Sequence, residues 1–459
     1  MRLVDLLIKN GIIVTMDSNR RILEGHSLAI DRGRIAEIAR TEELEKRYSG
    51  MDTVNAAGQI VMPGIVCSHT HLYDILVRAA TLDVTPPSDF TQLLQRTAWP
   101  VDEALNLEDA YASALVASVE FAKSGVTTFA DTYSGPNSIS GVLDRISEAV
   151  EEVGIRGFLA FEATERHSKD EGLRGLRENA RFAELTSKKT DSKTMPLFSL
   201  HASFTVTDEL IHETKRTAER FHAPITIHAS EGMGDLHHNL EHYGERTVER
   251  FADLGLLGSN LVLAHCVQLN SKEIGLIAKT KTGVAHNPMS NMQTAVGVSP
   301  VPQMLAQQIT VGLGNDGYIY DTFENMRSVY LIHRVSNRDP NAIDPYSILE
   351  MATLNGARLY GIDKDVGSIE VGKKADIISI KPSILPTPLT PATVVGHLIN
   401  TADGDDVEHV FVDGKQIVRN KRLLSFNEEK AQQISQKAAA NLWARLKNVT
   451  PQVDPLHRL

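Results

Sequence analysis

The sequence predicts an α/β protein, a (β/α)8 TIM barrel with a small β-sandwich domain formed from both chain ends. In the middle of the 459-residue chain, short apolar runs alternate with amphipathic helical stretches. Both flanks instead carry short β-type runs broken by turns. We therefore divide the chain into a composite sandwich (residues 1–62 and 360–425), a barrel (residues 63–359) and a C-terminal helix and tail (residues 426–459).

The two flanks share one texture. At the start, LLIKNGIIVTM and SLAIDRGRIAEIA are β-type runs interrupted by Asn-Gly and Arg-Gly turns. The same pattern returns in GSIEVGKKADIISIKP and VEHVFVDGKQIVRNKRLL, where the Asp-Gly pair predicts a tight hairpin. We expect these segments, far apart in the sequence, to assemble into one discontinuous domain.

Eight candidate strands occupy the middle of the chain, separated by helical stretches such as LEDAYASALVASVEFAKSG. One of these helices has a plausible N-cap at Thr207. A doubly wound open sheet is the structural alternative, but it would separate the first strand from the eighth. Because candidate site residues follow strands one, five, six and eight, a closed barrel is favoured. The strands begin near Gly64, Val126, Ile155, Leu197, Ile225, Leu261, Gly283 and Thr310.

Two segments fall outside this alternation. Residues 76–100 form a long connection after the first strand, and long connections are often lids or binding loops. Its Phe90, Leu94 and Trp99 could cover a substrate, while an ordinary packed helix is an equal alternative. Near the end, residues 427–448 predict an exposed helix.

Composition narrows the classes of partner. Hydrophobic residues make up 42% and charged residues 23%, as in soluble globular proteins. The net charge of −11 argues against nucleic acid, which needs clustered Lys and Arg. No signal peptide pattern and no run of about 20 apolar residues stands out, so no membrane partner is expected. The two cysteines, Cys67 and Cys266, imply no disulfide framework, and we expect a cytoplasmic location.

Metal-type residues stand at the ends of the apolar runs, and the C-terminal strand ends of a barrel share one face. His69 and His71 are two residues apart and would face the same way on a strand. His228 would supply a third nitrogen and Asp316 an oxygen. Such a set suits a divalent ion and leaves one position for water. We expect one ion, zinc first, with iron or manganese as alternatives.

Two further residues are assigned to proton chemistry. His265 would hydrogen-bond to the activated water, although it could instead bind a second ion. Two-metal sites commonly use a bridging carboxylate, often a modified Lys, on strand four, which here ends in FSLH; one ion is therefore favoured. Glu231 could carry a proton from water to a ring nitrogen or leaving group, the alternative being a carboxylate that stabilises a helix start.

These residues lie in longer phrases that resemble the amidohydrolase superfamily, in the branch of chlorohydrolases, cytosine/guanine deaminases and adenosylhomocysteine-type deaminases. The resemblance covers nearly the whole chain. Within that branch the chain is similar to SsnA-type aminohydrolases, on the phrases LHASFTV, HNPMSNMQTAVGVSPVPQML and GNDGYIYDTFENMR. The motifs that carry the family resemblance are PG with HTHL, GVTT, HASE, AHC, HNPMSN, GLGNDG, ATLNGA and GSIEVGKKAD.

The resemblance implies a mononuclear zinc or iron held by His69, His71, His228 and Asp316. It also implies that Glu231, His265 and Asp316 are catalytic. His201, after strand four, and His286, after strand seven, would contact substrate, and Trp99 would join them from the long connection. A role in purine breakdown and a homodimer or larger assembly follow from the same resemblance.

The predicted function is therefore a metal-dependent amidohydrolase that deaminates a purine-, pterin- or pyrimidine-like heterocycle, using a metal-activated water and releasing ammonia. A rival from the same chemistry is a hydrolase that opens a cyclic amide in a reduced purine, which would release no ammonia. A rival of another class is a non-catalytic scaffold derived from such an enzyme, which metal content would reveal.

Overall fold

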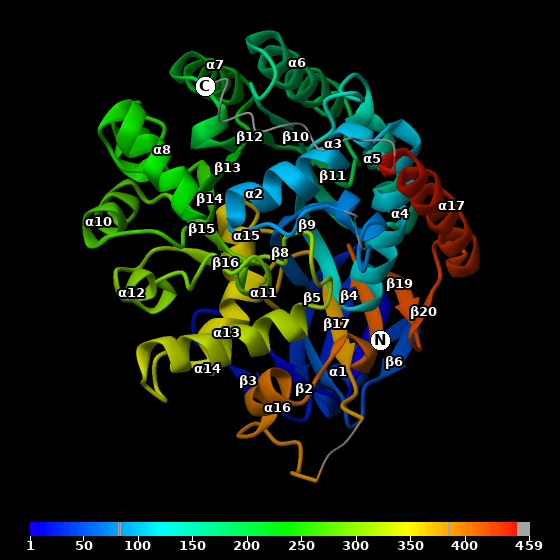
Figure 1. Ribbon diagram of the computed structural model, residues 1–459. Coiled ribbons are helices and arrows are strands. Elements are labelled where there is room, and N and C mark those ends of the chain that lie inside the picture. The colour runs from blue at the N-terminus through cyan, green and yellow to red at the C-terminus, as the bar shows by residue number, and fades with distance from the viewer. Residues whose placement is uncertain (81, 83, 384–385, 448–459) are drawn as a thin grey trace.

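The computed structural model describes residues 1–80, 82, 84–383 and 386–447. Its centre is a parallel sheet in which neighbouring strands follow the order of the chain, as predicted (Figure 1). A short extra strand, β11 (Thr194–Pro196), pairs with β10 outside this path. The strands of the path are β8 (Ile65–Thr70), β9 (Val126–Tyr133), β10 (Arg156–Ala163), β12 (Phe198–Ala202), β13 (Ile225–Ala229), β14 (Leu261–His265), β15 (Gly283–His286) and β16 (Val311–Leu313).

The last strand returns to the first at the C-terminal end of the sheet. Thr70 and Asp316 form a parallel bridge. The backbone amides of Asn315 and Asp316 both donate to the His69 carbonyl at 3.1 Å. The sheet is thus a nearly closed barrel, and the doubly wound alternative is wrong. Closure at this point also brings His69 and His71 beside Asp316.

Amphipathic helices cover the outside of the barrel (Figure 1). In α7, Leu210, Ile211, Thr214 and Ala218 lie buried on one face, at the spacing of helical turns. Its predicted N-cap is confirmed, since the Thr207 hydroxyl accepts from the Leu210 amide. The helices are α4 (Leu107–Lys123), α5 (Val142–Val153), α6 (Lys169–Thr186), α7 (Asp208–Phe221), α8 (Met233–Tyr243), α9 (Thr247–Asp253), α10 (Ser271–Thr280), α11 (Pro288–Gln293), α12 (Val301–Ala306), α13 (Thr322–Asn337), α14 (Pro345–Glu350) and α15 (Gly356–Leu359).

Two sheets form a second body beside the barrel. One has the order β5-β4-β1-β6 and the other β20-β19-β18-β17-β7-β2-β3, which mixes strands from both chain ends. Apolar side chains of both sheets share one core, among them Leu28 and Ile30 from the first and Val61 and Phe411 from the second. Their strands are β1 (Arg2–Lys9), β2 (Ile12–Val14), β3 (Ile22–Leu23), β4 (His26–Asp31), β5 (Arg34–Arg40), β6 (Tyr48–Asn55), β7 (Ile60–Pro63), β17 (Ile377–Ile380), β18 (Val407–Val412), β19 (Lys415–Arg419) and β20 (Arg422–Leu423).

The sandwich carries a short helix, α1 (Thr41–Arg47), whereas α16 (Val394–Asn400), between β17 and β18 in the chain, packs against α13 and α14 of the barrel. The hairpin predicted from Asp-Gly is confirmed: β18 and β19 pair antiparallel around Asp413 and Gly414, both with positive φ. The domain boundaries at residues 62, 359 and 425 remain our division of the chain.

The C-terminal helix α17 (Glu428–Leu446) forms as predicted and lies on the surface, but one of its faces is buried. Ala431, Ala438 and Leu442 are buried along one face. The Trp443 indole donates to the Leu76 carbonyl at 2.8 Å, which ties the helix to the start of the long connection. Residues 448–459 of the predicted tail lie outside the described residues.

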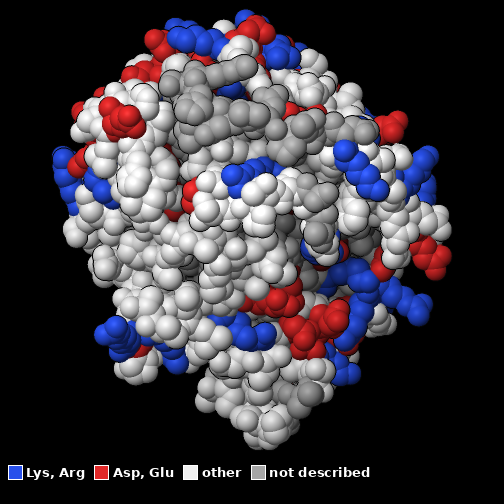
Figure 2. Space-filling view, in the orientation of Figure 1, with Lys and Arg blue, Asp and Glu red and all other residues white. Residues whose placement is uncertain are grey.

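The long connection contains helix α2 (Phe90–Leu93), a π-helical turn over residues 94–98 and α3 (Trp99–Ala104); residues 81 and 83 of it are not described. Helix α2 lies in front of the barrel in Figure 1. On this face Lys and Arg are interspersed with Asp and Glu around a largely uncharged centre (Figure 2). None of the described helices combines the length and apolarity required to cross a bilayer.

Candidate active site

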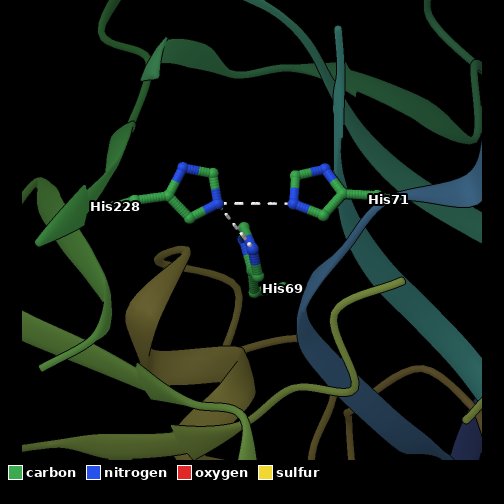
Figure 3. A group of neighbouring side chains, drawn as sticks. All are labelled: His69, His71 and His228. Carbon is green, nitrogen blue, oxygen red and sulfur yellow. Dashed lines mark hydrogen bonds between the residues drawn. The ribbon is translucent and has the colours of Figure 1, made fainter. Parts of the chain in front are cut away.

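Three imidazoles converge at the C-terminal mouth of the barrel. His69 lies in β8, His71 directly follows that strand, and His228 lies in β13. The His228 Nε2 is 3.2 Å from Nε2 of His69 and 3.3 Å from Nε2 of His71 (Figure 3). The three residues are 2%, 7% and 9% exposed, so bulk water does not separate them.

Hydrogen bonds at Nδ1 of His71 and of His228 determine which ring nitrogens carry a proton. The Nδ1 of His71 lies 2.8 Å from the Thr132 carbonyl, and that of His228 lies 2.7 Å from the His201 carbonyl. A carbonyl only accepts, so each Nδ1 carries a proton and donates it. In the neutral rings the Nε2 lone pairs would then face one another at close range. A cation between them removes that repulsion, and the residues therefore fit a metal ion.

Asp316 supplies the predicted carboxylate. Its Oδ1 lies 3.1 Å from Nε2 of His71 and 3.8 Å from Nε2 of His69. The Ser290 hydroxyl donates to its Oδ2 at 2.5 Å, which fixes the orientation of the carboxylate. The structure thus brings together all four predicted ligands. Two groups of side chains that contain His69 are close enough together to hold one ion. One group also contains His71 and His228, and the other also contains His265 and Asp316.

Left-handed backbone recurs where the strands end. Ser230, His265, Cys266 and Asp316 all have positive φ, between 52° and 72°. This conformation is uncommon for residues with a Cβ and stores strain that tends to cluster at functional sites. The chain therefore turns sharply at the ends of β13, β14 and β16.

The proton-transfer residues lie beside this cluster. His265 Nε2 is 3.6 Å from Asp316 Oδ2, and its Nδ1 is 3.5 Å from Glu231 Oε1. The Nδ1 of His265 also lies 2.8 Å from the Asn291 side-chain oxygen, which favours the tautomer that leaves Nε2 free of a proton. Glu231, His265 and Asp316 form a connected row of proton donors and acceptors.

Burial and mutual contact set the charges of the cluster. Burial lowers the pKa of His69 well below its ordinary value and that of His228 to about 4. Burial opposes charge on His71 most strongly, but the hydrogen bond with Asp316 and the negative charges of Asp316, Glu162 and Asp74 together raise the His71 pKa well above its ordinary value. Burial likewise opposes charge on Asp316, but the hydrogen bond with His71 and the attraction of the neighbouring imidazoles together hold that pKa well below its usual range. The cluster thus favours one bound positive charge next to Asp316, which a metal ion would replace.

The two remaining groups are held mainly in their neutral forms. Burial lowers the pKa of His265 to about 4, so the imidazole is neutral at pH 7. Burial raises the pKa of Glu231 well above its ordinary value, with Asp316 adding to the shift. A protonated Glu231 is an acid, and a neutral His265 is a base or acceptor.

A cavity of about 720 Å³ opens in front of these groups. His71, His228, Glu231, His265 and Asp316 line its floor. The long connection supplies much of the remaining wall, including Phe90, Leu94 and Trp99 as predicted. A volume of this size suits a small heterocyclic compound.

The predicted substrate contacts divide into two groups. His201 and Trp99 line the cavity, and their ring centroids are 6.4 Å apart. His286 is not among the lining residues. It is 1% exposed, and its Nε2 lies 3.2 Å from Nε2 of His333 on α13. In this geometry His286 therefore does not face the cavity, where the predicted contact with substrate would be made.

Several polar residues of the site escaped the sequence reasoning. Glu162, near the end of β10, lines the cavity and its Oε1 lies 3.4 Å from Nδ1 of His228. Asp74 and Asp102 line the cavity as well. The signal for Glu162 was present, since it interrupts the apolar run FLAFEA close to a strand end. Asp74 lies just before residues 76–100 and Asp102 just after them, in α3, where no strand alternation fixes the direction of a side chain.

The chain matches the amidohydrolase family over residues 60–417. It is 34% identical to the 5'-deoxyadenosine deaminase of Methanosarcina acetivorans, across 96% of this chain and 99% of that protein. It is 31% identical to the 5-methylthioadenosine/S-adenosylhomocysteine deaminase of Desulforudis audaxviator, across 95% and 99%. The structure of an adenosine deaminase from Xanthomonas campestris with bound zinc superposes with a TM-score of 0.87 at 26% identity, covering 98% of this chain and all of that one.

Proposed function

The chain belongs to the amidohydrolase family, and we propose that its substrate is a 6-aminopurine, free or as a nucleoside. The protein is a metal-dependent hydrolase of non-peptide C–N bonds that deaminates a nitrogen heterocycle. Full-length relatives named for adenosine derivatives support the purine, and they favour it over the pterin and pyrimidine alternatives. The observation that carries the proposal is the meeting of three imidazoles, Asp316, Glu231 and His265 at one cavity.

His69, His71, His228 and Asp316 would hold the metal, for which we propose a single zinc ion. When bound, the ion would supply Lewis acidity that lowers the pKa of a coordinated water from 15.7 to about 7. The donor set of imidazoles and one carboxylate matches zinc better than calcium or magnesium, which prefer oxygen ligands.

The side chains then divide the proton transfers. Asp316 Oδ2 and His265 Nε2, which carries no proton and lies 3.3 Å from Nδ2 of Asn287, are placed to accept a proton from the attacking water. Glu231, protonated through burial, would donate to the ring nitrogen next to the carbon under attack, which increases the electron demand at that carbon. The carbon–oxygen bond forms, the carbon–nitrogen bond breaks, and the amino group leaves as ammonia. Water and the aminopurine are converted into the oxopurine and ammonia.

The test is a substrate screen on the metal-loaded enzyme, with ammonia and ultraviolet absorbance recorded together. Adenosine, 5'-deoxyadenosine, 5-methylthioadenosine, adenine and guanine are the first compounds, followed by pterins, pyrimidines and reduced purines. We expect ammonia release in step with the absorbance change for at least one 6-aminopurine. An absorbance change without ammonia would support the ring-opening alternative instead, and no turnover of any purine would contradict the proposal.

The pathway, the location and the assembly of the enzyme are part of the same proposal. We propose that the enzyme acts in purine breakdown, lies in the cytoplasm and assembles as a homodimer or larger oligomer. Light scattering after size exclusion would decide the assembly. The scaffold alternative has no support, because full-length relatives are named enzymes and every predicted ligand reaches the site.

A further inference from the structure

The cavity wall carries more carboxylates than the proposed chemistry uses. Glu231 and Asp316 take part in proton transfer, but Asp74, Asp102 and Glu162 line the same cavity. Glu162 lies next to the proposed metal ligand His228, with 3.4 Å between Oε1 and Nδ1. Its carboxylate falls within 4.8 Å of nitrogens of His201 and His228, and the residue is only 2% exposed.

The arginines nearby are already paired with other carboxylates. Arg78 lines the cavity, but its Nη1 and Nη2 donate to both oxygens of Glu120, at 2.9 and 2.7 Å. Arg166 contacts Asp102, with 2.9 Å between Nη1 and Oδ2, and donates from Nη2 to the Ser134 hydroxyl. Arg166, whose Nε and Nη1 make no hydrogen bond among the described residues, does not line the cavity. Arg78 is the one Lys or Arg among the described lining residues, so an anionic group entering the cavity would meet carboxylates without a free guanidinium on that lining.

The acidic wall also contains hydrogen-bond acceptors that lack donors. Asp102 Oδ2 is shared by Arg166 and Ser134, whereas its buried Oδ1 has no hydrogen-bond partner within the described part of the chain. The hydroxyl of Thr132 donates to Glu162 Oε1 at 3.3 Å, and among described residues no hydrogen bond reaches Oε2. A buried acceptor without a donor is costly, and native proteins leave few of them. A ligand that brings N–H or O–H groups would satisfy these oxygens.

We propose that Glu162 is a specificity-determining residue that accepts a hydrogen bond from an N–H or O–H group of the substrate. It selects uncharged or cationic amino-heterocycles and rejects those with an anionic substituent. The inference depends on the proposed function for the identity of the cavity as the substrate site. It goes beyond the proposed reaction, because phosphorylated and unphosphorylated aminopurines present the same reacting carbon. The deamination chemistry alone therefore does not discriminate between them.

The experiment compares adenosine with adenosine 5'-monophosphate in the zinc-loaded wild type and in Glu162→Gln. Binding is measured by calorimetry and turnover by ammonia release, and zinc content is determined for each protein. Gln keeps the shape of Glu, removes its charge and replaces one acceptor with a donor. The matched control is Asp170→Asn, which neutralises an exposed carboxylate eight residues further on, outside the cavity.

In the wild type we expect adenosine to bind at least about tenfold more tightly than the monophosphate. Glu162→Gln should weaken adenosine binding about 10- to 100-fold, raise KM more than it lowers kcat, and reduce the discrimination against the phosphate. Zinc content should not change, and Asp170→Asn should behave as the wild type.

Each contrary result has its own meaning. Equal binding of adenosine and its monophosphate in the wild type would overturn the inference, as would an unchanged discrimination in Glu162→Gln. Loss of zinc in that variant would show that Glu162 positions His228 instead of contacting substrate, and would also overturn it. The expected charge preference without ammonia release would contradict the proposed deamination alone. Failure of both compounds to bind would contradict both.

Discussion

The barrel mouth and the junction between barrel and sandwich both bury charges, but they treat them in opposite ways. At the junction, Arg156 of β10 contacts Asp376 at 3.2 Å and Asp413 at 2.9 Å, and Arg156 and Asp376 are almost fully buried. Lys193 also pairs with Asp413, at 2.7 Å. Every one of these charges has a partner within the protein.

At the barrel mouth the partners are missing. Glu231, Glu162 and Asp74 lie around one cavity with no lysine or arginine paired to them among the described residues. Burial without a cationic partner raises the pKa of Glu231 well above its ordinary value and that of Asp74 to about 8, so both carboxyl groups are held mainly neutral. A charged carboxylate at this place needs a ligand that supplies the opposite charge. The paired charges at the junction therefore hold the barrel and the sandwich together. The unpaired groups at the barrel mouth find their partners only when a cation and a substrate bind.

The largest effect should follow removal of His69, which belongs to two of the groups of side chains that could hold one ion. We expect His69→Ala to lose bound zinc and to lower deaminase activity by about 10⁴-fold or more, because an activated water is no longer available at neutral pH. Metal analysis and ammonia release measure the two effects. If His69→Ala retains both bound zinc and activity, His69 is not required to hold the cation, and the proposed difference between the barrel mouth and the junction is contradicted.

Glu231→Gln should come next, with kcat reduced about 10²- to 10⁴-fold while zinc remains bound. The amide keeps the size of the side chain but cannot donate the acidic proton. Steady-state kinetics on the substrate found by the screen, together with metal analysis, would show this. Full turnover in this variant would exclude the assigned role of Glu231.

The junction should respond in stability instead of catalysis. Arg156→Met leaves Asp376 buried without its partner, and we expect the free energy of unfolding to fall by about 3–5 kcal/mol. Urea denaturation measures it, with exposed Arg174→Met as the control, expected to cost less than about 0.5 kcal/mol. Activity per folded molecule should change little. A loss below about 1 kcal/mol for Arg156→Met would show that this pairing does not stabilise the junction.

The smallest effect concerns an exposed pairing at the rim. His167 contacts Glu103 at 3.1 Å and Glu171 at 2.7 Å, and these contacts raise its pKa to about 9. Because the folded pKa exceeds the ordinary value of 6.5, the stabilisation is complete below pH 6.5 and is lost as pH rises through 9. Exposure limits it to below about 1 kcal/mol.

Melting temperatures of the wild type and His167→Gln, taken between pH 6 and 9.5, would test this rim pairing. The wild type should melt higher at pH 6, and the difference should disappear near pH 9.5. A difference that is constant with pH would mean that packing, and not the charge of His167, is responsible.

Sequence reasoning reached residues whose direction follows from local geometry. His69 and His71 share a face because strand residues alternate, and His228 and Asp316 followed from the common C-terminal edge of parallel strands. It overlooked Glu162, although strand position gave the same signal, because no partner was visible in the sequence. It also expected α17 to be exposed, whereas a face of small apolar residues packs onto the barrel helices.

The sequence alone determined the alternation of strands and helices, the two β-rich ends and the chemical type of the site, because apolar periodicity and strand ends are local properties. Tertiary structure decided the rest. It turned His286 towards His333, placed the long connection along the cavity wall and left Glu162 without a paired lysine or arginine among the described residues. These outcomes depend on which neighbours surround a side chain, and only the closed barrel brings neighbours from distant strands together.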